Sequence, residues 1–182
     1  MSPSSQLTSS AARALRDGKA AGSWVLDGSR TEIRLKSKSI WGLVPVNGVF
    51  GQVSGNGTVS PSGDVTGTIT VAAQSIDTGH KGRDNHLRSA DFFEVDSYPA
   101  ITFTVDSVTE AGNGLTVAGQ LSVRGRTRPV SFDVSVSRFD GGEAHLDGEL
   151  RVNRADFGLT WNRLGMVSMN NTITVHAVFT RQ

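Results

Sequence analysis

The chain of 182 residues contains no cysteine, only 5 prolines and no long apolar run. The lack of cysteine excludes a disulfide framework, a thiolate metal site and a cysteine nucleophile. No segment approaches the ~18 consecutive apolar residues that a membrane-spanning helix needs, so we expect no stable membrane insertion. An excess of charge is also missing, because 18 Lys and Arg residues balance 17 Asp and Glu residues to a net charge of +1. This balance is not typical of nucleic-acid binding, and we predict no nucleic-acid partner.

The first 22 residues lack the continuous apolar centre of a secretory signal peptide, since Ser and Thr interrupt every apolar cluster. They are rich in Ser and Ala and place Arg13 and Arg16 ahead of the first acidic residue, Asp17. This composition predicts a disordered tail over residues 1–22. We therefore expect a single domain over residues 23–182 and an unprocessed, cytoplasmic protein.

From Trp24 onward, apolar and polar side chains alternate with a period of two, which predicts strands. Turn residues such as Gly112-Asn113-Gly114 separate the alternating runs. About eight strands in up-and-down order predict an all-β fold, an eight-stranded antiparallel lipocalin-like barrel, because closure removes exposed strand edges. A two-sheet sandwich is the structural alternative. The predicted strand regions are 31–38, 44–59, 65–71, 101–105, 115–123, 130–137, 146–152 and 173–180.

One long connection, between about residues 74 and 100, breaks the alternation. Connections of this length are usually functional or locally structured. We predict a short helix in it, over residues 91–94, with Ser89 or the first of these residues as the N-cap. Such a segment can cross one mouth of the barrel with Phe92 and Phe93 as its buried face.

The same connection carries a motif that resembles the signature of the YceI-like family. It reads Ser75-Ile76-Asp77-Thr78, Arg83-Asp84-x-His86-Leu87-Arg88-Ser89-x-Asp91-Phe92-Phe93-Glu94-Val95 and Tyr98-Pro99, and further matches are Gly119-x-Leu121-x-Val123-x-Gly125-x-Thr127-x-Pro129-Val130 and Asn153-Arg154-x-Asp156-Phe157-Gly158-Leu159. The resemblance runs from about Trp24 to the C-terminus. It implies a lipocalin-like barrel that holds a polyisoprenoid chain, such as an isoprenoid quinone tail, in an elongated apolar interior. Where the family often has a His before a Gly in the first hairpin, this chain has Ile40-Trp41-Gly42.

An eight-stranded barrel either fills with side chains or holds one small ligand. Small inward residues, among them Gly67, Gly119, Gly148 and Ala177, predict room for a ligand, and a dry packed core is the alternative. Burial of each isoprene unit contributes about 3 kcal/mol gross, so four or more units offset the ~4–15 kcal/mol cost of association without a polar contact. The residues predicted to line the cavity and bind the ligand are Ile33, Leu35, Phe50, Ile69, Val71, Phe92, Phe103, Leu121, Phe132, Val134, Leu150, Phe157, Leu159, Trp161, Met166, Met169 and Ile173.

A cluster of charged residues in the long connection has two interpretations. Arg83, Asp84, His86 and Arg88 could meet a ligand headgroup at the barrel mouth, where arginine offers fork-shaped donors. The interpretation we favour is structural, with the aspartates capping turns and pairing with the arginines. We predict no metal site, because the loop spacing does not force His80, His86 and a carboxylate together.

The sequence contains no G-x-S-x-G, HExxH or P-loop motif. We therefore predict a non-enzymatic protein that binds, stores or transports a polyisoprenoid lipid, either an isoprenoid quinone or a polyprenyl chain, and that has no other cofactor. An enzyme acting on such a lipid, with Arg83, Asp84 and His86 at its site, is the alternative. A stress-protective binding module without a fixed ligand is a third possibility. The predicted partner is a hydrophobic small molecule, and a homodimer of side-by-side barrels stays open.

Overall fold

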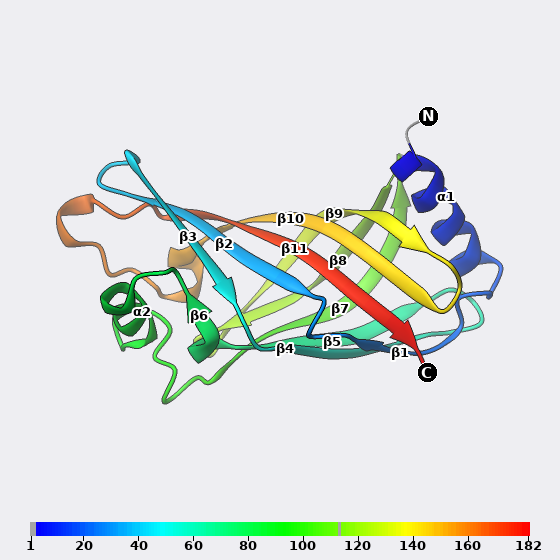
Figure 1. The fold of residues 1–182 in the computed structure, drawn as a ribbon, viewed down its shortest axis with the longest axis horizontal. Coiled ribbons are helices and arrows are strands. Elements are labelled where there is room, and N and C mark those ends of the chain that lie inside the picture. The colour runs from blue at the N-terminus through cyan, green and yellow to red at the C-terminus, as the bar shows by residue number, and fades with distance from the viewer. Residues whose placement is uncertain (1–2, 113) are drawn as a thin grey trace.

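The computed structural model describes residues 3–112 and 114–182, which form an elongated β-barrel with a helix at each end (Figure 1). Its strands are β1 (Gly22–Leu26), β2 (Glu32–Ser39), β3 (Val44–Phe50), β4 (Val53–Val59), β5 (Val65–Ala72), β6 (Ile76–Asp77), β7 (Ala100–Ala111), β8 (Gly114–Val123), β9 (Arg126–Phe139), β10 (Glu143–Asn153) and β11 (Asn170–Arg181). Its helices are α1 (Pro3–Arg16) and α2 (Lys81–Arg88), and three short 3-10 turns are η1 (Ala73–Ser75), η2 (Arg154–Phe157) and η3 (Arg163–Gly165).

The sheet closes on itself as a ring of eight antiparallel strands. The order is β1-β4-β5-β7-β8-β9-β10-β11, and β11 returns to pair with β1. In its first half, β11 pairs with β2 instead of β1, and β2 in turn pairs with β3, as β1 pairs with β4. The predicted eight-stranded barrel is confirmed. Residues 44–59 form two strands rather than one, because β3 pairs with β2 whereas β4, after a break at residues 51–52, pairs with β1.

The alternation in the sequence sets which face of each strand looks inward. Leu35 of β2 pairs with Ile173 of β11, and Phe103 of β7 pairs with Leu121 of β8, so apolar side chains of neighbouring strands meet on one face. Because side chains of a strand alternate between its two faces, the polar residues between them point outward. The inner face of the barrel is therefore almost entirely apolar.

Helix α1 covers the end of the barrel that holds both chain termini (Figure 1). Thr8, Ala11, Ala12 and Leu15 are spaced as one face of a helix. Both alanines are buried against β8 and β9, and the Thr8 hydroxyl accepts a hydrogen bond of 2.9 Å from the Val136 amide. The prediction of a disordered tail is thus wrong for residues 3–16. Ala11, Ala12 and Ala14 favour a helix, and all three are buried on the barrel, so packing stabilises the segment.

The long connection after β5 covers the other end of the barrel, as predicted, but its helix lies elsewhere than expected. The helix spans Lys81–Arg88, with the His80 side chain accepting from the Arg83 amide at the N-cap and Ser89 at the C-cap. The predicted helix at 91–94 is wrong, because that stretch forms turns that bury Phe92 and Phe93. No helix in the described part of the chain is long and apolar enough to cross a membrane.

Candidate ligand-binding cavity

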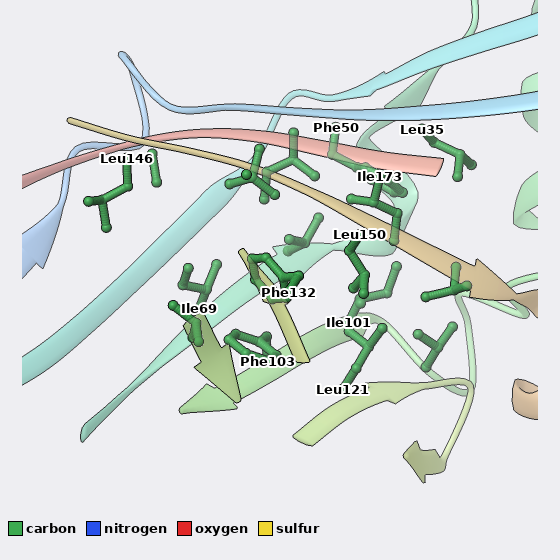
Figure 2. A pocket seen from close by; sticks show the side chains of 18 of the residues that line it. Leu35, Phe50, Ile69, Ile101, Phe103, Leu121, Phe132, Leu146, Leu150 and Ile173 are labelled. Carbon is green, nitrogen blue, oxygen red and sulfur yellow. The ribbon is translucent and has the colours of Figure 1, made fainter. Parts of the chain in front are cut away.

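The barrel encloses a cavity of about 500 Å³. Inward side chains such as Phe103, Phe132 and Ile69 are only partly buried although they lie in the middle of the wall, because they face open space. A filled barrel would bury them as completely as Val136, which is 0% exposed. Figure 2 shows apolar side chains from strands on all sides directed toward one space; those labelled are Leu35, Phe50, Ile69, Ile101, Phe103, Leu121, Phe132, Leu146, Leu150 and Ile173.

The cavity extends along the length of the barrel. Leu15 and Trp24 line it near α1, while His86 and Trp161 line it near α2, and these two groups stand at opposite ends of the molecule. The volume lies within the ~300–1,000 Å³ range of small-molecule sites. Such a narrow, long and apolar space suits a flexible hydrocarbon chain better than a compact polar molecule.

Two glycines help to keep the middle of the cavity open. A β-carbon at Gly119 would lie 2.7 Å from the Phe103 ring, and one at Gly148 would lie 3.2 Å from the Phe132 ring. Each ring therefore lies in the space of the wall that the side chain of any residue larger than glycine would fill at position 119 or 148. Their centroids are 5.6 Å apart, so the two aromatic side chains contact each other along one side of the lumen.

Charge in the cavity wall is confined to the α2 end and is of one sign. Lys38, Arg83 and Arg154 line the cavity there, and no Asp or Glu of the described residues lines it. His86 lies among aromatic rings, with centroid distances of 5.1 Å to Phe92 and 4.5 Å to Trp161. This end, which we call the mouth, combines cationic and aromatic groups around an apolar interior.

Arg154 is the most unusual residue of the mouth. It is 6% exposed, and its guanidinium donates to the carbonyls of Leu159 at 2.6 Å, Ser168 at 2.9 Å and Val167 at 3.5 Å. Burial lowers the pKa of this guanidinium, but an arginine keeps its charge in proteins. Within residues 3–112 and 114–182 it forms no ion pair, so its charge is balanced by carbonyl dipoles and by the Phe92 ring at 5.5 Å.

The charged residues of the long connection divide into structural and mouth-facing groups. Buried Asp84 accepts from the amide of Thr78 at 2.9 Å and from its hydroxyl at 2.5 Å, and Arg88 donates to the carbonyls of Gln74 and Ile76. Neither lines the cavity. Arg83 and His86 do line it, although Arg83 also donates to the hydroxyl and the carbonyl of Thr78.

All residues predicted to line the cavity do so except Met166 and Met169. That the others contact a ligand stays a prediction. The placement of the two methionines on the wall is wrong, because the loop of residues 158–169 turns only some of its side chains, among them Leu159, Trp161 and Val167, to the cavity. Arg154 and Lys38 are not among the predicted site residues, and the only sequence signal for Arg154 is its place in the segment Asn153–Leu159 that matches the family. No cluster of His, Asp and Glu that could hold a metal ion occurs among the residues described.

The barrel is similar to those of known proteins. A family model described as YceI-like domain matches residues 24–180. The solved structure of BcnA from Burkholderia cenocepacia gives a TM-score of 0.76 at 25% identity, covering 84% of this chain and 98% of BcnA. A polyisoprenoid binding domain from Saccharophagus degradans gives a TM-score of 0.71 at 17% identity, covering 87% of this chain and 98% of that domain.

Sequence relatives agree with the structural ones. The protein YceI of Salmonella arizonae is 35% identical over 106 residues, which is 56% of this chain and 55% of that protein. The same identity and coverage hold for YceI of Salmonella newport. The chain thus spans about half the length of the curated relatives it matches. Helix α1 lies outside the region that the family model matches.

Proposed function

The chain belongs to the YceI-like family, and on that premise we propose that its barrel binds a polyisoprenoid lipid, an isoprenoid quinone or a polyprenyl chain, in the apolar lumen. The observation that carries this proposal is the open, lengthwise cavity with partly exposed apolar walls. The Saccharophagus degradans domain, described as polyisoprenoid binding, supports it through the shared fold.

The energetics of the lumen favour a long chain. Each isoprene unit that leaves water contributes about 3 kcal/mol gross, and the wall offers apolar contacts from Trp161 at the mouth to Leu15 at the far end. Affinity is therefore expected to rise with each added unit until the chain reaches α1. A chain of four or more units offsets the ~4–15 kcal/mol cost of association.

The polar end of the ligand is assigned to the mouth. Arg154 carries a buried positive charge that is paired with no carboxylate of the described residues, and Arg83 and His86 lie on the same wall. A quinone carbonyl or a phosphate would find cationic donors here and aromatic surface beside them. The orientation that follows is a polar headgroup at the α2 end and a hydrocarbon tail toward α1.

Binding without catalysis is the function that we propose, either for storage or for transport of the lipid. The hydrogen bonds that Asp84 accepts support a structural role for it, and it does not line the cavity, so one of the three residues that the enzyme alternative would use is engaged elsewhere. An enzyme would need a base or nucleophile against the ligand. Among the described residues that line the mouth, His86 is the candidate base, and its Nε2 is paired with Asp91 at 2.8 Å; the arginines and the lysine there supply positive charge rather than a base or a nucleophile.

Mass spectrometry of an organic extract from the natively purified, detergent-free protein tests the proposal. We expect a prenyl lipid at about one molecule per protein chain. Repeated extracts that contain no prenyl lipid, or only straight-chain fatty acids, would contradict it. Incubation with polyprenols of two, four and eight isoprene units then gives the dependence on chain length, and equal affinities would contradict a lumen-bound tail.

A further inference from the structure

Large apolar side chains gather on the outside of the molecule at one end. Seven large hydrophobic residues are exposed in the described chain, and four of them lie on two neighbouring loops with a fifth at the adjoining start of β3. These five, which we call the apolar tip, are Ile40, Trp41, Leu43, Val44 and Leu164. The exposed fractions are 67% for Trp41, 78% for Leu43 and 77% for Leu164. Exposed apolar clusters of this kind mark interaction surfaces.

The two loops of the apolar tip are held together by the backbone. The amide of Trp41 donates to the carbonyl of Met166 at 3.2 Å, and the amide of Ser168 donates to the carbonyl of Lys38 at 2.9 Å. Both loops lie at the α2 end of the barrel, opposite the chain termini, and the loop before β11 extends beyond α2 (Figure 1). The tip is therefore one surface made from the β2–β3 turn and the loop that precedes β11.

The backbone conformation of the tip presents these side chains to solvent at an energetic cost. Ile40, Trp41 and Leu164 have φ angles of 53°, 51° and 56°. Side chains with a β-carbon rarely adopt this left-handed conformation, and a β-branched residue such as isoleucine does so least readily. No burial compensates for this at Trp41 or Leu164 in the isolated chain. A partner that takes up these side chains would supply the missing burial.

Positive charge surrounds the apolar tip. Residues 36–47 and 158–170 contain Lys36, Lys38 and Arg163 and no Asp or Glu. All three cations are exposed, and none takes part in the ion pairs among described residues. The two loops and the adjoining end of β2, which carries Lys36 and Lys38, thus have +3 of formal charge in a chain whose net charge is +1. Tryptophan and leucine flanked by lysine and arginine fit the interface of a bilayer with anionic headgroups.

The apolar tip adjoins the mouth of the cavity. Lys38 and Ser39, which precede the tip in β2, and Val167, which follows it, line the cavity wall. We propose that the apolar tip docks peripherally on an anionic lipid bilayer, with Trp41, Leu43 and Leu164 among the headgroups and the mouth facing the membrane. Docking itself depends only on this surface. Its purpose, direct exchange of a prenyl lipid between bilayer and lumen, rests on the proposed function.

Vesicle flotation tests the docking. We expect the full-length protein to float with phosphatidylcholine vesicles that contain 30% phosphatidylglycerol, and to bind pure phosphatidylcholine vesicles far less. The variant L43S/L164S should bind the anionic vesicles at least tenfold more weakly, and each of K36Q, K38Q and R163Q about fivefold more weakly. The control V25T changes an exposed apolar residue outside the tip and should bind like the unmodified protein.

The fluorescence of Trp41 gives a second readout. Vesicle binding should shift tryptophan emission to shorter wavelength. The measurement uses the variant W161F, because Trp161 lies at the mouth. Adding W41F to it should abolish the shift, because the remaining Trp24 is buried at the α1 end. Failure of the unmodified protein to float, binding by L43S/L164S equal to that of V25T, or a shift that persists in W41F/W161F would each overturn the docking. A tip-dependent dimer that binds no vesicles would also overturn it, in favour of a second copy of the chain.

Different results would overturn the proposed docking and the proposed ligand. A prenyl lipid in the extract of a protein that does not float overturns docking and leaves lipid binding in place. Flotation of a protein whose extracts never contain a prenyl lipid supports docking and overturns the proposed ligand.

Discussion

The ring of Phe132 lies so close to Gly148 that a β-carbon on the glycine would come within 3.2 Å of ring atom Cε2. Both residues line the cavity, and the glycine leaves wall space that the ring occupies. The same relationship holds between Phe103 and Gly119 on the neighbouring strands β7 and β8. Each of these two phenylalanine rings thus packs over a glycine, which has no side chain. The barrel therefore remains hollow although it is rich in aromatic surface.

A ring added to the lumen should displace the ligand without unfolding the barrel. Val175 is partly buried and lines the cavity, so Val175→Phe would extend into open space. We expect at least a tenfold loss of co-purified lipid and a change in the free energy of unfolding below about 1 kcal/mol, in contrast to the ~1–3 kcal/mol of an overpacked core. Extract mass spectrometry and urea unfolding measure the two quantities.

The matched control for this variant is Thr174→Phe, on the same strand but outside the cavity lining. It should retain the lipid. A strongly destabilised Val175→Phe protein, or equal lipid loss in both variants, would indicate a packed interior.

Helix α1 is expected to stabilise the barrel through one buried hydrogen bond. Thr8 is 2% exposed, and its hydroxyl accepts from the Val136 amide. Thr8→Val keeps the shape of the side chain but removes the acceptor, which should lower the free energy of unfolding by about 1–3 kcal/mol. Ser9→Ala, one residue along on the exposed face, should change it by less than about 0.5 kcal/mol. Urea unfolding of both variants decides, and equal stabilities would mean that α1 does not contribute through this contact.

Asp27 gives a prediction for the pH dependence of stability. Hydrogen bonds from Ser29 and Arg30 lower the pKa of this carboxyl from 3.8 to about 2. Because the pKa is depressed in the folded state, the stabilisation is present above pH ~4 and is lost as the pH falls toward 2. The Tm difference between the unmodified protein and Asp27→Asn should therefore shrink between pH 4 and pH 2. A difference that stays constant over this range would contradict the assignment.

Asp84 and His86 are expected to separate stability from binding. Asp84→Asn weakens the buried contacts to Thr78 and should cost about 1–3 kcal/mol of stability, with the lipid-to-protein ratio of the folded fraction unchanged. His86→Ala should retain most of the lipid, because apolar burial dominates the affinity. Complete lipid loss in His86→Ala, with stability retained, would point instead to a polar contact as the main source of binding.

Much of the barrel follows from the sequence because alternation reports directly on which side of a strand is buried. The alternation of Ile33 and Leu35 with charged residues is enough to place both on the wall. Helix α1 was missed although Thr8, Ala11, Ala12 and Leu15 have helical spacing, because alanine adds little apolar contrast against serine. Helical spacing of small residues is a signal that composition alone conceals.

The mouth was harder to predict, because its residues sit on loops where no periodicity applies. Met166 and Met169 were assigned to the wall by residue type, and the loop carries both outside it. Periodicity gives no sign that Arg154 is buried, because the three carbonyls that accept hydrogen bonds from it are brought together only by the fold. The apolar tip cannot be read from the sequence, because Trp41 and Leu164 are more than a hundred residues apart and the loops that carry them are brought together by the pairing of β2 with β11.

The most direct test of the hollow lumen is a crystal structure of the natively purified protein at a resolution that shows ordered solvent. The account predicts continuous tubular density that starts beside Trp161, passes Phe103 and Phe132, and ends near Leu15. Rearranged side chains that close the lumen, or a file of ordered water in place of the tube, would contradict it.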